Sequence, residues 1–270
     1  MESLQFMNHS DIRLSAWLEG RVALVTGAAQ GLGYAAAFQL ASLGARVFIF
    51  DRDQKLVHEA ASKLPGEAQG IYGDATVEAD RERAIELILA KAGGLHILVN
   101  NAGIQYHADA MEMDEEGWRR AFEVNVHSMM FFSKLASRPM ARQKDGSIIN
   151  IGSISSFFGM PRRSVYVTTK TAVLGMTRAL ATEFGRHNIR VNAVCPGYHE
   201  TRLFKEYVEK GVLDPEVIRG RIPLGRIGLP DDIGGAVALL CSPLANYITG
   251  QAIMVDGGYT VYGAPDPLTF

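Results

Sequence analysis

Short apolar runs alternate along the chain with segments of helical periodicity. The apolar runs cover residues 22–26, 46–50, 69–74, 96–100, 147–152, 190–195 and 252–256, and their length is typical of buried strands. The segments between them, such as the alanine-rich stretch 32–43, are long enough for helices. Strands joined by right-handed helical crossovers pair in parallel and are covered on both faces. The pattern therefore predicts an α/β fold with a doubly wound parallel sheet.

One domain is the simplest organisation for this chain. Its 270 residues are 47% hydrophobic and 21% charged, which is enough for one sizeable core. Residues 1–19 lack the basic start and continuous apolar core of a signal peptide, and no stretch of about 18 apolar residues occurs. We expect residues 1–19 to form an arm along the sheet edge or a neighbouring subunit, or a disordered tail, and residues 20–270 to form the domain. A cytoplasmic protein without a membrane span is expected.

Charge and cysteine content exclude several classes of partner. The net charge is −2 and no run of Lys or Arg exceeds two residues, so binding to nucleic acid or to an anionic membrane is not expected. Cys195 and Cys241 are too far apart for a metal-binding pair, and the seven histidines fall at no ligand spacing. We expect two buried thiols in a reducing compartment and no metal site.

A glycine-rich turn follows the first strand. Gly27, Gly31 and Gly33 lie between the apolar run 22–26 and the helix that begins near Leu32. Glycines let the backbone turn tightly and approach a pyrophosphate, whose charge is met by the N–H groups at the positive end of the helix. The spacing differs from the commoner G-x-G-x-x-G, and a tight structural loop is the alternative. The strand before and the helix after favour a dinucleotide site.

Asp51 ends the next strand, 18 residues after Gly33. This is close to the distance expected for the acidic residue that binds the ribose of a dinucleotide. A carboxylate there accepts both ribose hydroxyls and repels a 2′-phosphate, whereas the neighbouring Arg52 would favour that phosphate. Gln30 adds no positive charge in the glycine turn. NAD is therefore expected over NADP.

Tyr166 and Lys170 form an i, i+4 pair, which places both side chains on one face of a helix. A cation at about 4 Å, with an effective dielectric constant of about 20, favours the phenolate by roughly 4 kcal/mol before desolvation. This corresponds to about three pKa units, so we expect the phenol to exchange a proton near neutral pH. An incidental pair on a surface helix is the alternative.

These motifs occur in the order found in one known family. They are Thr26 to Gly33, Asp74, Asn100 to Gly103, Asn125 in EVNV, Ser153, Tyr166 with Lys170, and Pro196 with Gly197. From about Gly20 to Tyr259 the chain resembles a short-chain dehydrogenase/reductase of the compact branch of about 250 residues. The resemblance implies a Rossmann-like single domain that both binds a dinucleotide and contains the catalytic residues.

The resemblance also implies catalytic roles for four residues. Tyr166 would exchange a proton with the reacting oxygen, and Ser153 would donate a hydrogen bond to that oxygen. Lys170 would keep the phenol acidic and bind the nicotinamide ribose. Asn125, on a helix expected from about Gly117 to Met140, would break the helical geometry enough to hold a water linking Lys170 to solvent. Without the EVNV context, Asn125 would be taken as a helix-surface amide and Ser153 as a turn former.

A larger set is implied to bind the cofactor. Asp74 would bind the adenine with Ala75 beside it, residues 101–103 would line the adenosine ribose, and Thr201 would bind the carboxamide or pyrophosphate. The full set comprises Gly27, Gln30, Gly31, Leu32, Gly33, Asp51, Asp74, Ala75, Asn101, Ala102, Gly103, Tyr166, Lys170, Pro196, Gly197 and Thr201.

Substrate is expected between the loops after Gly103, Ser153 and Pro196. Apolar and polar side chains of these loops could contact it: Phe157, Phe158, Met160, His107, Arg162, Arg163, His199 and Arg202. Solvated rim charges are the alternative for the arginines.

Three functions are consistent with the sequence. The leading one is an NAD-dependent oxidoreductase that interconverts a secondary alcohol and a ketone on a small polyol, sugar or hydroxy acid. The second is a 3-oxoacyl-(acyl-carrier-protein) reductase, which would need NADPH and a basic docking patch; Arg119 with Arg120 and Arg162 with Arg163 are the obvious basic pairs. The third is a non-catalytic dinucleotide sensor. The resemblance further implies a homotetramer built on the helices near Trp118 and Tyr166 and on the strand 252–256.

Overall fold

The computed structural model describes residues 17–263. Most of the predicted N-terminal arm lies outside these residues. At its end, Leu18 is fully buried in the core, and its backbone N–H donates to the carbonyl oxygen of Leu43 at 2.9 Å. The stretch just before the first strand is therefore packed against the domain.

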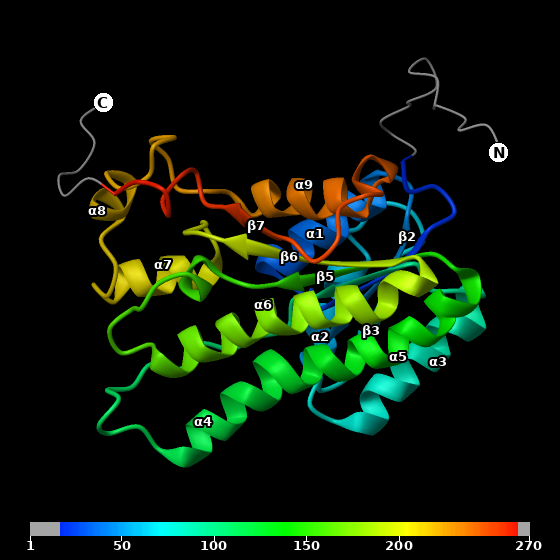
Figure 1. Ribbon diagram of the computed structural model, residues 1–270, viewed down its shortest axis with the longest axis horizontal. Helices are drawn as coiled ribbons and strands as arrows, with labels where there is room; N and C mark the ends of the chain where they lie inside the picture. The colour runs from blue at the N-terminus through cyan, green and yellow to red at the C-terminus, as the bar shows by residue number, and fades with distance from the viewer. Residues whose placement is uncertain (1–16, 264–270) are drawn as a thin grey trace.

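Seven strands form one parallel sheet, as the pattern of apolar runs predicts (Figure 1). In spatial order they run β3-β2-β1-β4-β5-β6-β7, and every neighbouring pair is parallel. Each lies within two residues of the predicted bounds. They are β1 (Val22–Thr26), β2 (Arg46–Asp51), β3 (Gln69–Tyr72), β4 (Ile97–Asn100), β5 (Gly146–Ile151), β6 (Ile189–Pro196) and β7 (Ala252–Val255).

Helices cover both faces of the sheet, so the doubly wound, Rossmann-like single domain is confirmed. The helices are α1 (Gly31–Ser42), α2 (Gln54–Ala61), α3 (Glu78–Ala92), α4 (Glu115–Phe122), α5 (Ser128–Gln143), α6 (Ser164–Phe184), α7 (Arg202–Glu209), α8 (Pro215–Arg219) and α9 (Pro230–Cys241). Figure 1 shows α1 and α9 on one side of the sheet and α5 and α6 on the other. None of the helices within residues 17–263 is long and apolar enough to span a bilayer.

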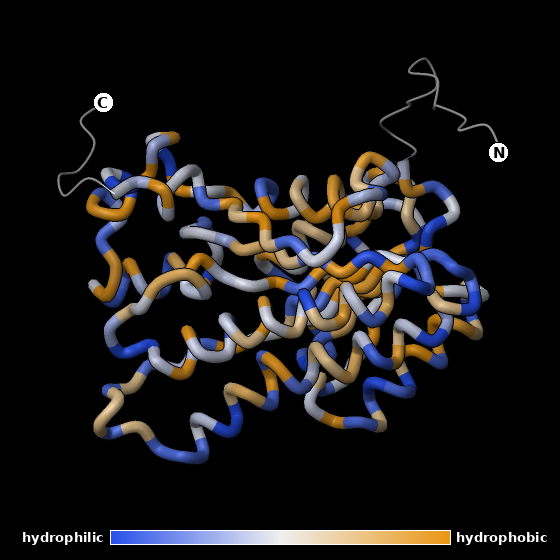
Figure 2. Tube along the Cα trace, in the orientation of Figure 1, coloured by the Kyte–Doolittle hydropathy of each residue, from blue (hydrophilic) through white to orange (hydrophobic). Residues whose placement is uncertain are grey.

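Alternate residues of each strand enter different halves of the core. Val25 and Ile49 pack in the half that contains α1, α2 and α9, whereas Leu24 and Phe50 pack in the half that contains α3, α5 and α6. In Figure 2 the hydrophobic stretches gather along the strands in the middle of the molecule. Because both faces are buried, the strands are continuous apolar runs rather than alternating ones.

The single helix expected from Gly117 to Met140 is interrupted. A π-helical turn at Glu123–His127 separates α4 from α5. Such a turn widens the helix by one residue and is frequent at functional sites. Asn125 lies in the middle of it and is fully buried.

The order of the strands reverses between β1 and β4. The chain passes from β1 to β2 and β3 on one side, then returns to β4 and continues through β5, β6 and β7 on the other. Ligands of open α/β sheets bind at the carboxyl ends of the strands at this switch point. The glycine turn that follows β1 and the loop that follows β4 lie there.

Residues 198–229, between β6 and α9, form a separate excursion that contains α7 and α8 (Figure 1). Its side chains have their own small apolar cluster around Phe204, Ile218 and Ile222, with Tyr198 and Leu213 packed against it. The excursion therefore rests beside the sheet rather than inside its core.

Candidate active site

The glycine turn after β1 has the conformation of a phosphate cradle. Gly27 and Gly31 both have φ of 62°, in the left-handed region that favours glycine. A Cβ at Gly33 would lie 2.4 Å from the side-chain nitrogen of Asn101 and 2.5 Å from the Gly27 carbonyl oxygen. Gln30 provides no side-chain cap to α1, and the first turn of α1 holds no acidic residue. The positive end of α1 is thus open to an anion.

The segment after β4 braces this turn. The Thr26 hydroxyl accepts hydrogen bonds at 3.1 Å from the backbone N–H groups of Asn101 and Ala102. The Asn101 side-chain amide donates to the carbonyl oxygens of Thr26 at 3.0 Å and Gly27 at 2.7 Å. Its side chain therefore holds the cradle in shape.

Asp51 lies at the end of β2 with its half-buried carboxylate turned toward the glycine turn. It accepts hydrogen bonds from the backbone N–H of Ala29 at 3.1 Å and of Asp53 at 3.2 Å. Arg52 is exposed. The carboxylate is thus held beside the cradle, where a ribose is expected.

Asp74 follows β3 and is held by its own loop. Its Oδ1 atom accepts from the backbone N–H of Thr76 at 2.8 Å and from the Thr76 hydroxyl at 2.7 Å, and Arg120 lies 3.4 Å from Oδ2. Partial burial opposes ionisation, but these hydrogen bonds and the Arg120 charge hold the pKa of Asp74 below its usual range. The backbone carbonyl of neighbouring Ala75 accepts from Arg81 at 2.8 Å.

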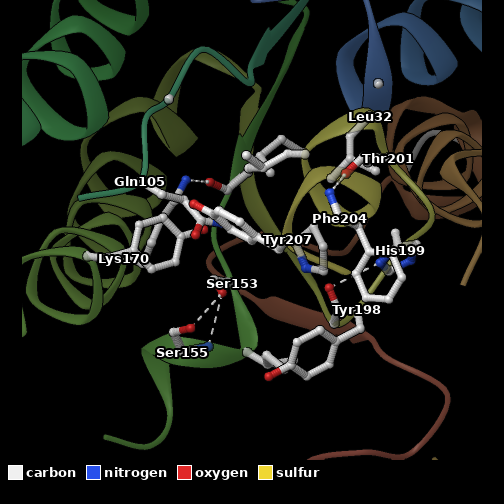
Figure 3. A pocket seen from close by; sticks show the side chains of 18 of the residues that line it. Leu32, Gln105, Ser153, Ser155, Lys170, Tyr198, His199, Thr201, Phe204 and Tyr207 are labelled. Carbon is white, nitrogen blue, oxygen red and sulfur yellow. Dashed lines mark hydrogen bonds between the residues drawn. The ribbon is translucent and has the colours of Figure 1, made fainter. Parts of the chain in front are cut away.

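A cavity of about 350 Å³ opens between the cradle, the ends of β5 and β6, and α7 (Figure 3). Of the residues predicted from sequence, eleven line it: Gln30, Gly31, Leu32, Asn101, Gly103, Ser153, Tyr166, Lys170, Pro196, Gly197 and Thr201. The others lie outside its lining: Gly27, Gly33, Asp51, Asp74, Ala75, Ala102 and Asn125. No cluster of three or more potential metal ligands occurs in the described part of the chain.

Lys170 is buried at the floor of this cavity. Its Nζ donates to the carbonyl oxygen of Ile151 at 2.8 Å and lies 5.8 Å from the centre of the Tyr166 ring. Burial disfavours the ammonium and lowers the pKa of Lys170 to about 8.

The pKa of Tyr166 differs in direction from the sequence-based expectation. Burial raises it above its ordinary value, while the neighbouring Ser153 hydroxyl and the charge of Arg163 act in the opposite direction. The expectation that Lys170 brings the pKa of the phenol near neutrality is thus wrong. The sequence-based expectation included the charge of Lys170 but not the desolvation of the phenol. In the structure, Nζ of Lys170 donates to the carbonyl oxygen of Ile151.

Ser153 lies just beyond β5 and is buried. Its hydroxyl donates to the Ser155 hydroxyl at 3.1 Å and accepts from the backbone N–H of Ser155 at 3.0 Å (Figure 3). These bonds fix the Ser153 oxygen at the cavity wall that Tyr166 and Lys170 also line.

Asn125 connects the loop after β4 to α6. Its side chain accepts from the backbone N–H of Ile104 at 2.8 Å and donates to the Ile104 carbonyl at 2.9 Å and to the Thr169 hydroxyl at 3.1 Å. The predicted break in helical geometry at Asn125 is present as the π-turn. The side chain lies behind the cavity wall and holds it together.

Several lining residues were not singled out from the sequence, among them the polar residues Gln105, Tyr198, Glu206 and Tyr207. Their loops were expected to meet substrate, but no spacing rule distinguishes a lining residue within a loop of irregular shape. Of the candidates that were named, Met160, Arg163, His199 and Arg202 line the cavity. Phe157 is 45% exposed and Phe158 packs on Tyr259, so neither forms the expected apolar wall.

Known proteins resemble this chain over most of its length. A family model described as enoyl-(acyl carrier protein) reductase matches residues 27–260. The chain is 37% identical over 248 residues to a 3-oxoacyl-(acyl-carrier-protein) reductase of Thermotoga maritima, covering 90% of this chain and 99% of the relative. It is 38% identical over 255 residues to an L-tagatose-forming galactitol 2-dehydrogenase of Cereibacter sphaeroides, covering 93% of this chain and 100% of the relative.

Among solved structures, a gluconate 5-dehydrogenase from Burkholderia cenocepacia in complex with NADP and tartrate superposes with a TM-score of 0.86. It is 32% identical in sequence, and the match covers 92% of this chain and 98% of that chain. The agreement therefore extends over most of this chain.

The lowered pKa of Lys170 predicts a pH-dependent stability. Between about pH 8 and the ordinary lysine value of 10.5, the unfolded chain binds a proton that the folded protein has lost, so stability rises with pH in this window. From pH 7.5 to 9.5, the free energy of unfolding of the wild type should rise by about 2 kcal/mol relative to that of Lys170→Met. Denaturant unfolding of both proteins measures this difference. Lys63→Met, at an exposed lysine, should show no such trend, and a flat difference for Lys170→Met would contradict the shift.

Proposed function

We propose that this chain, which belongs to the short-chain dehydrogenase/reductase family, uses NAD to interconvert a secondary alcohol and a ketone. The proposed substrate is a small polyol, sugar or hydroxy acid. Members of the family are NAD(P)-dependent alcohol dehydrogenases and ketoreductases. One observation carries the proposal. Ser153, Tyr166 and Lys170 line a single cavity beside an open glycine cradle at the carboxyl end of the sheet.

The residues present fit a dinucleotide. Gly27, Gly31 and Gly33 leave room for a pyrophosphate at the start of α1, and Asp51 offers carboxylate oxygens to the adenosine ribose. Asp74 and the 101–103 backbone would lie along the adenosine, while Lys170, Pro196, Gly197 and Thr201 would hold the nicotinamide half. When bound, the nicotinamide accepts or supplies the hydride.

The side chains of this protein would handle the proton. Tyr166 takes the hydroxyl proton during oxidation and returns it to the carbonyl oxygen during reduction. Ser153 donates a hydrogen bond to the same oxygen, where charge develops in the transition state. Lys170 supplies positive charge behind the phenol at pH values below about 8. Asn125 holds Ile104 and Thr169, and so sets the distance between the loop and the catalytic helix.

Polar lining and two relatives support a hydroxylated substrate. Gln105, Tyr207 and Arg163 place amide, hydroxyl and guanidinium groups in the cavity. The names of two related proteins describe a dehydrogenase of galactitol and one of gluconate. A site that hydrogen-bonds a substrate hydroxyl strongly rejects an analogue without it, because the polar groups of the site are then left unpaired.

The acyl reductase remains the second candidate, since the Thermotoga maritima relative is named as one. Two features disfavour it. Asp51 opposes the 2′-phosphate of NADPH, and three of the four arginines in the basic pairs either form ion pairs or line the cavity instead of the outer surface. Arg119 pairs with Glu115 at 2.6 Å, Arg120 pairs with Asp74, and Arg163 donates to Gln105 within the cavity. A dinucleotide sensor without activity is disfavoured because Tyr166 and Lys170 are both present.

We also propose a cytoplasmic homotetramer. Free, buried Cys195 and Cys241 support a reducing compartment. The strand β7 is an edge strand, and its Ile253 and Met254 are 38% and 39% exposed. On α5, Phe131 is 41% exposed. Apolar side chains at an open sheet edge and on a helix are suited to isologous contacts with copies of the chain.

Removing the phenol hydroxyl should stop catalysis while leaving cofactor binding intact. Tyr166→Phe should lower kcat at least 100-fold, the usual contribution of a general acid/base, with the NAD dissociation constant changed less than about threefold. Steady-state kinetics and a cofactor titration measure the two quantities. Tyr72→Phe, which removes the hydroxyl of an exposed tyrosine on β3, serves as the control. Retention of most activity by Tyr166→Phe would refute the mechanism.

Cofactor choice should depend on Asp51. NAD(H) should bind at least tenfold more tightly than NADP(H), because a phosphate beside this carboxylate costs about 1.4 kcal/mol or more. Asp51→Ser should reduce the preference to less than about threefold. Asp53→Ser is a matched control, since it removes a nearby carboxylate but keeps a residue able to cap α2. Equal affinity of the wild type for both cofactors would contradict the proposed preference for NAD.

Assembly can be tested at the sheet edge. Sedimentation at micromolar concentration should show a species of four times the 29.4 kDa chain mass. Met254→Glu places like charges across the proposed contact and should shift the protein to smaller species. Met111→Glu, at a methionine that is 97% exposed elsewhere, should not. A wild-type monomer would contradict the proposed tetramer.

A further inference from the structure

Arg163 is a cation in the active-site cavity that lacks a carboxylate partner. It is half-buried, lies at the start of α6 and lines the cavity. Within residues 17–263 its guanidinium makes one hydrogen bond, from the NH1 nitrogen to Oε1 of Gln105 at 2.8 Å. A guanidinium has five N–H donors, so most of its donors remain available to a ligand.

The other ionisable side chains of the cavity wall have a charged partner, a role proposed above or a buried position. Arg202 and Glu206 form an ion pair at 3.5 Å. Lys170 lies at the floor, against Ile151 and Tyr166. His199 is buried, and this burial lowers its pKa. Arg163 therefore gives this cavity a positive charge that no carboxylate of the described residues neutralises.

Gln105 extends this donor set. Its Oε1 atom accepts from Arg163 and lies 2.9 Å from Nε2 of His107, which must donate since the oxygen can only accept. The amide nitrogen of Gln105 is then left without a hydrogen bond to the described residues. His107 packs on Tyr207 with ring centres 5.3 Å apart, which holds the arrangement in place. Figure 3 shows Gln105 and Tyr207 around the same cavity as Ser153 and Lys170.

We propose that Arg163 and Gln105 form a subsite for the carboxylate of the substrate, so that the enzyme acts on hydroxy acids and their keto acids in preference to uncharged polyols. The inference rests on the proposed function and names its substrate class. Arginine presents N–H groups in a planar fork that matches a planar carboxylate, and the adjacent amide extends this donor set.

The position of Arg163 relative to Tyr166 suits a small acid. Both residues line the same cavity, and the charge of Arg163 is close enough to the Tyr166 phenol to act on its pKa, which it lowers against the larger effect of burial. An acid of a few carbons can therefore hold its carboxylate at Arg163 while a hydroxyl along its chain reaches the Tyr166 phenol. An uncharged polyol has the same hydroxyls but leaves the guanidinium without a partner.

Paired substrates separate the carboxylate from the rest of the molecule. Gluconate and glucitol, and galactonate and galactitol, share a carbon skeleton and differ in one carboxylate. For the wild type, kcat/KM should be at least about tenfold higher for the preferred acid than for its alditol. Arg163→Gln should lower kcat/KM for the acid about 100-fold, mainly through KM, and change that for the alditol less than about threefold.

Arg162→Gln provides a matched control. It removes the same charge from the preceding residue, which is exposed and does not line the cavity, so the kinetics of both substrates should stay near those of the wild type. Arg163→Lys should recover only part of the preference, because a lysine keeps the charge but loses the fork. The KM for the acid should also rise with ionic strength more steeply than that for the alditol.

Each contrary outcome has a separate meaning. Equal losses for acid and alditol in Arg163→Gln would overturn the subsite and make Arg163 a structural brace of the loop after β4. A wild type that prefers alditols, or that prefers sugar phosphates to both, would also overturn it while the proposed oxidoreductase function stands. Turnover of 3-oxoacyl thioesters alone, with every acid and alditol inert, would instead contradict the proposed function.

Discussion

A continuous set of hydrogen bonds through the segment after β4 holds the glycine turn after β1 and the helix α6 in one arrangement. At one end, Asn101 and Ala102 are bonded to the turn after β1 through Thr26. At the other, Ile104 is bonded to Asn125, which also donates to Thr169 on α6. Each such bond contributes only about 1 kcal/mol net, but leaving a buried partner unpaired costs about 1–3 kcal/mol. A shift of this segment would therefore disturb both halves of the site at once, and the π-turn at Asn125 is the local distortion that allows the link.

The parts of the fold that the sequence predicts are those set by local rules. Strands buried on both faces must be apolar throughout, so their positions follow from short runs of Val, Ile, Leu and Phe. The left-handed φ angles of Gly27 and Gly31 require glycine, and parallel strands bring Asp51, Asn101 and Ser153 to the same edge of the sheet. The i, i+4 spacing likewise fixes Tyr166 and Lys170 on one face of α6.

Features that depend on contacts across space could not be predicted in this way. The length of a loop does not reveal that Gln105 and Tyr207, about 100 positions apart in the chain, meet at one cavity. The direction of the Tyr166 pKa shift depends on how much protein encloses the phenol and on whether Lys170 donates to it or to Ile151. The spacing of residues along a helix determines neither the enclosure of the phenol nor the hydrogen-bond acceptor of Lys170. The same reason explains why Phe158, a plausible pocket wall, packs on Tyr259 instead.

The separate apolar cluster of the excursion 198–229 has an evolutionary consequence. Its contacts around Phe204, Ile218 and Ile222 are largely internal, so substitutions there need not be matched by changes under the sheet. The excursion also contributes Tyr198, Glu206 and Tyr207 to the wall where substrate is expected. Changes in about thirty residues can therefore alter this wall while the glycine turn and the sheet stay unchanged. Such partial independence of folding and specificity is one physical basis for diversification of a fold by gene duplication.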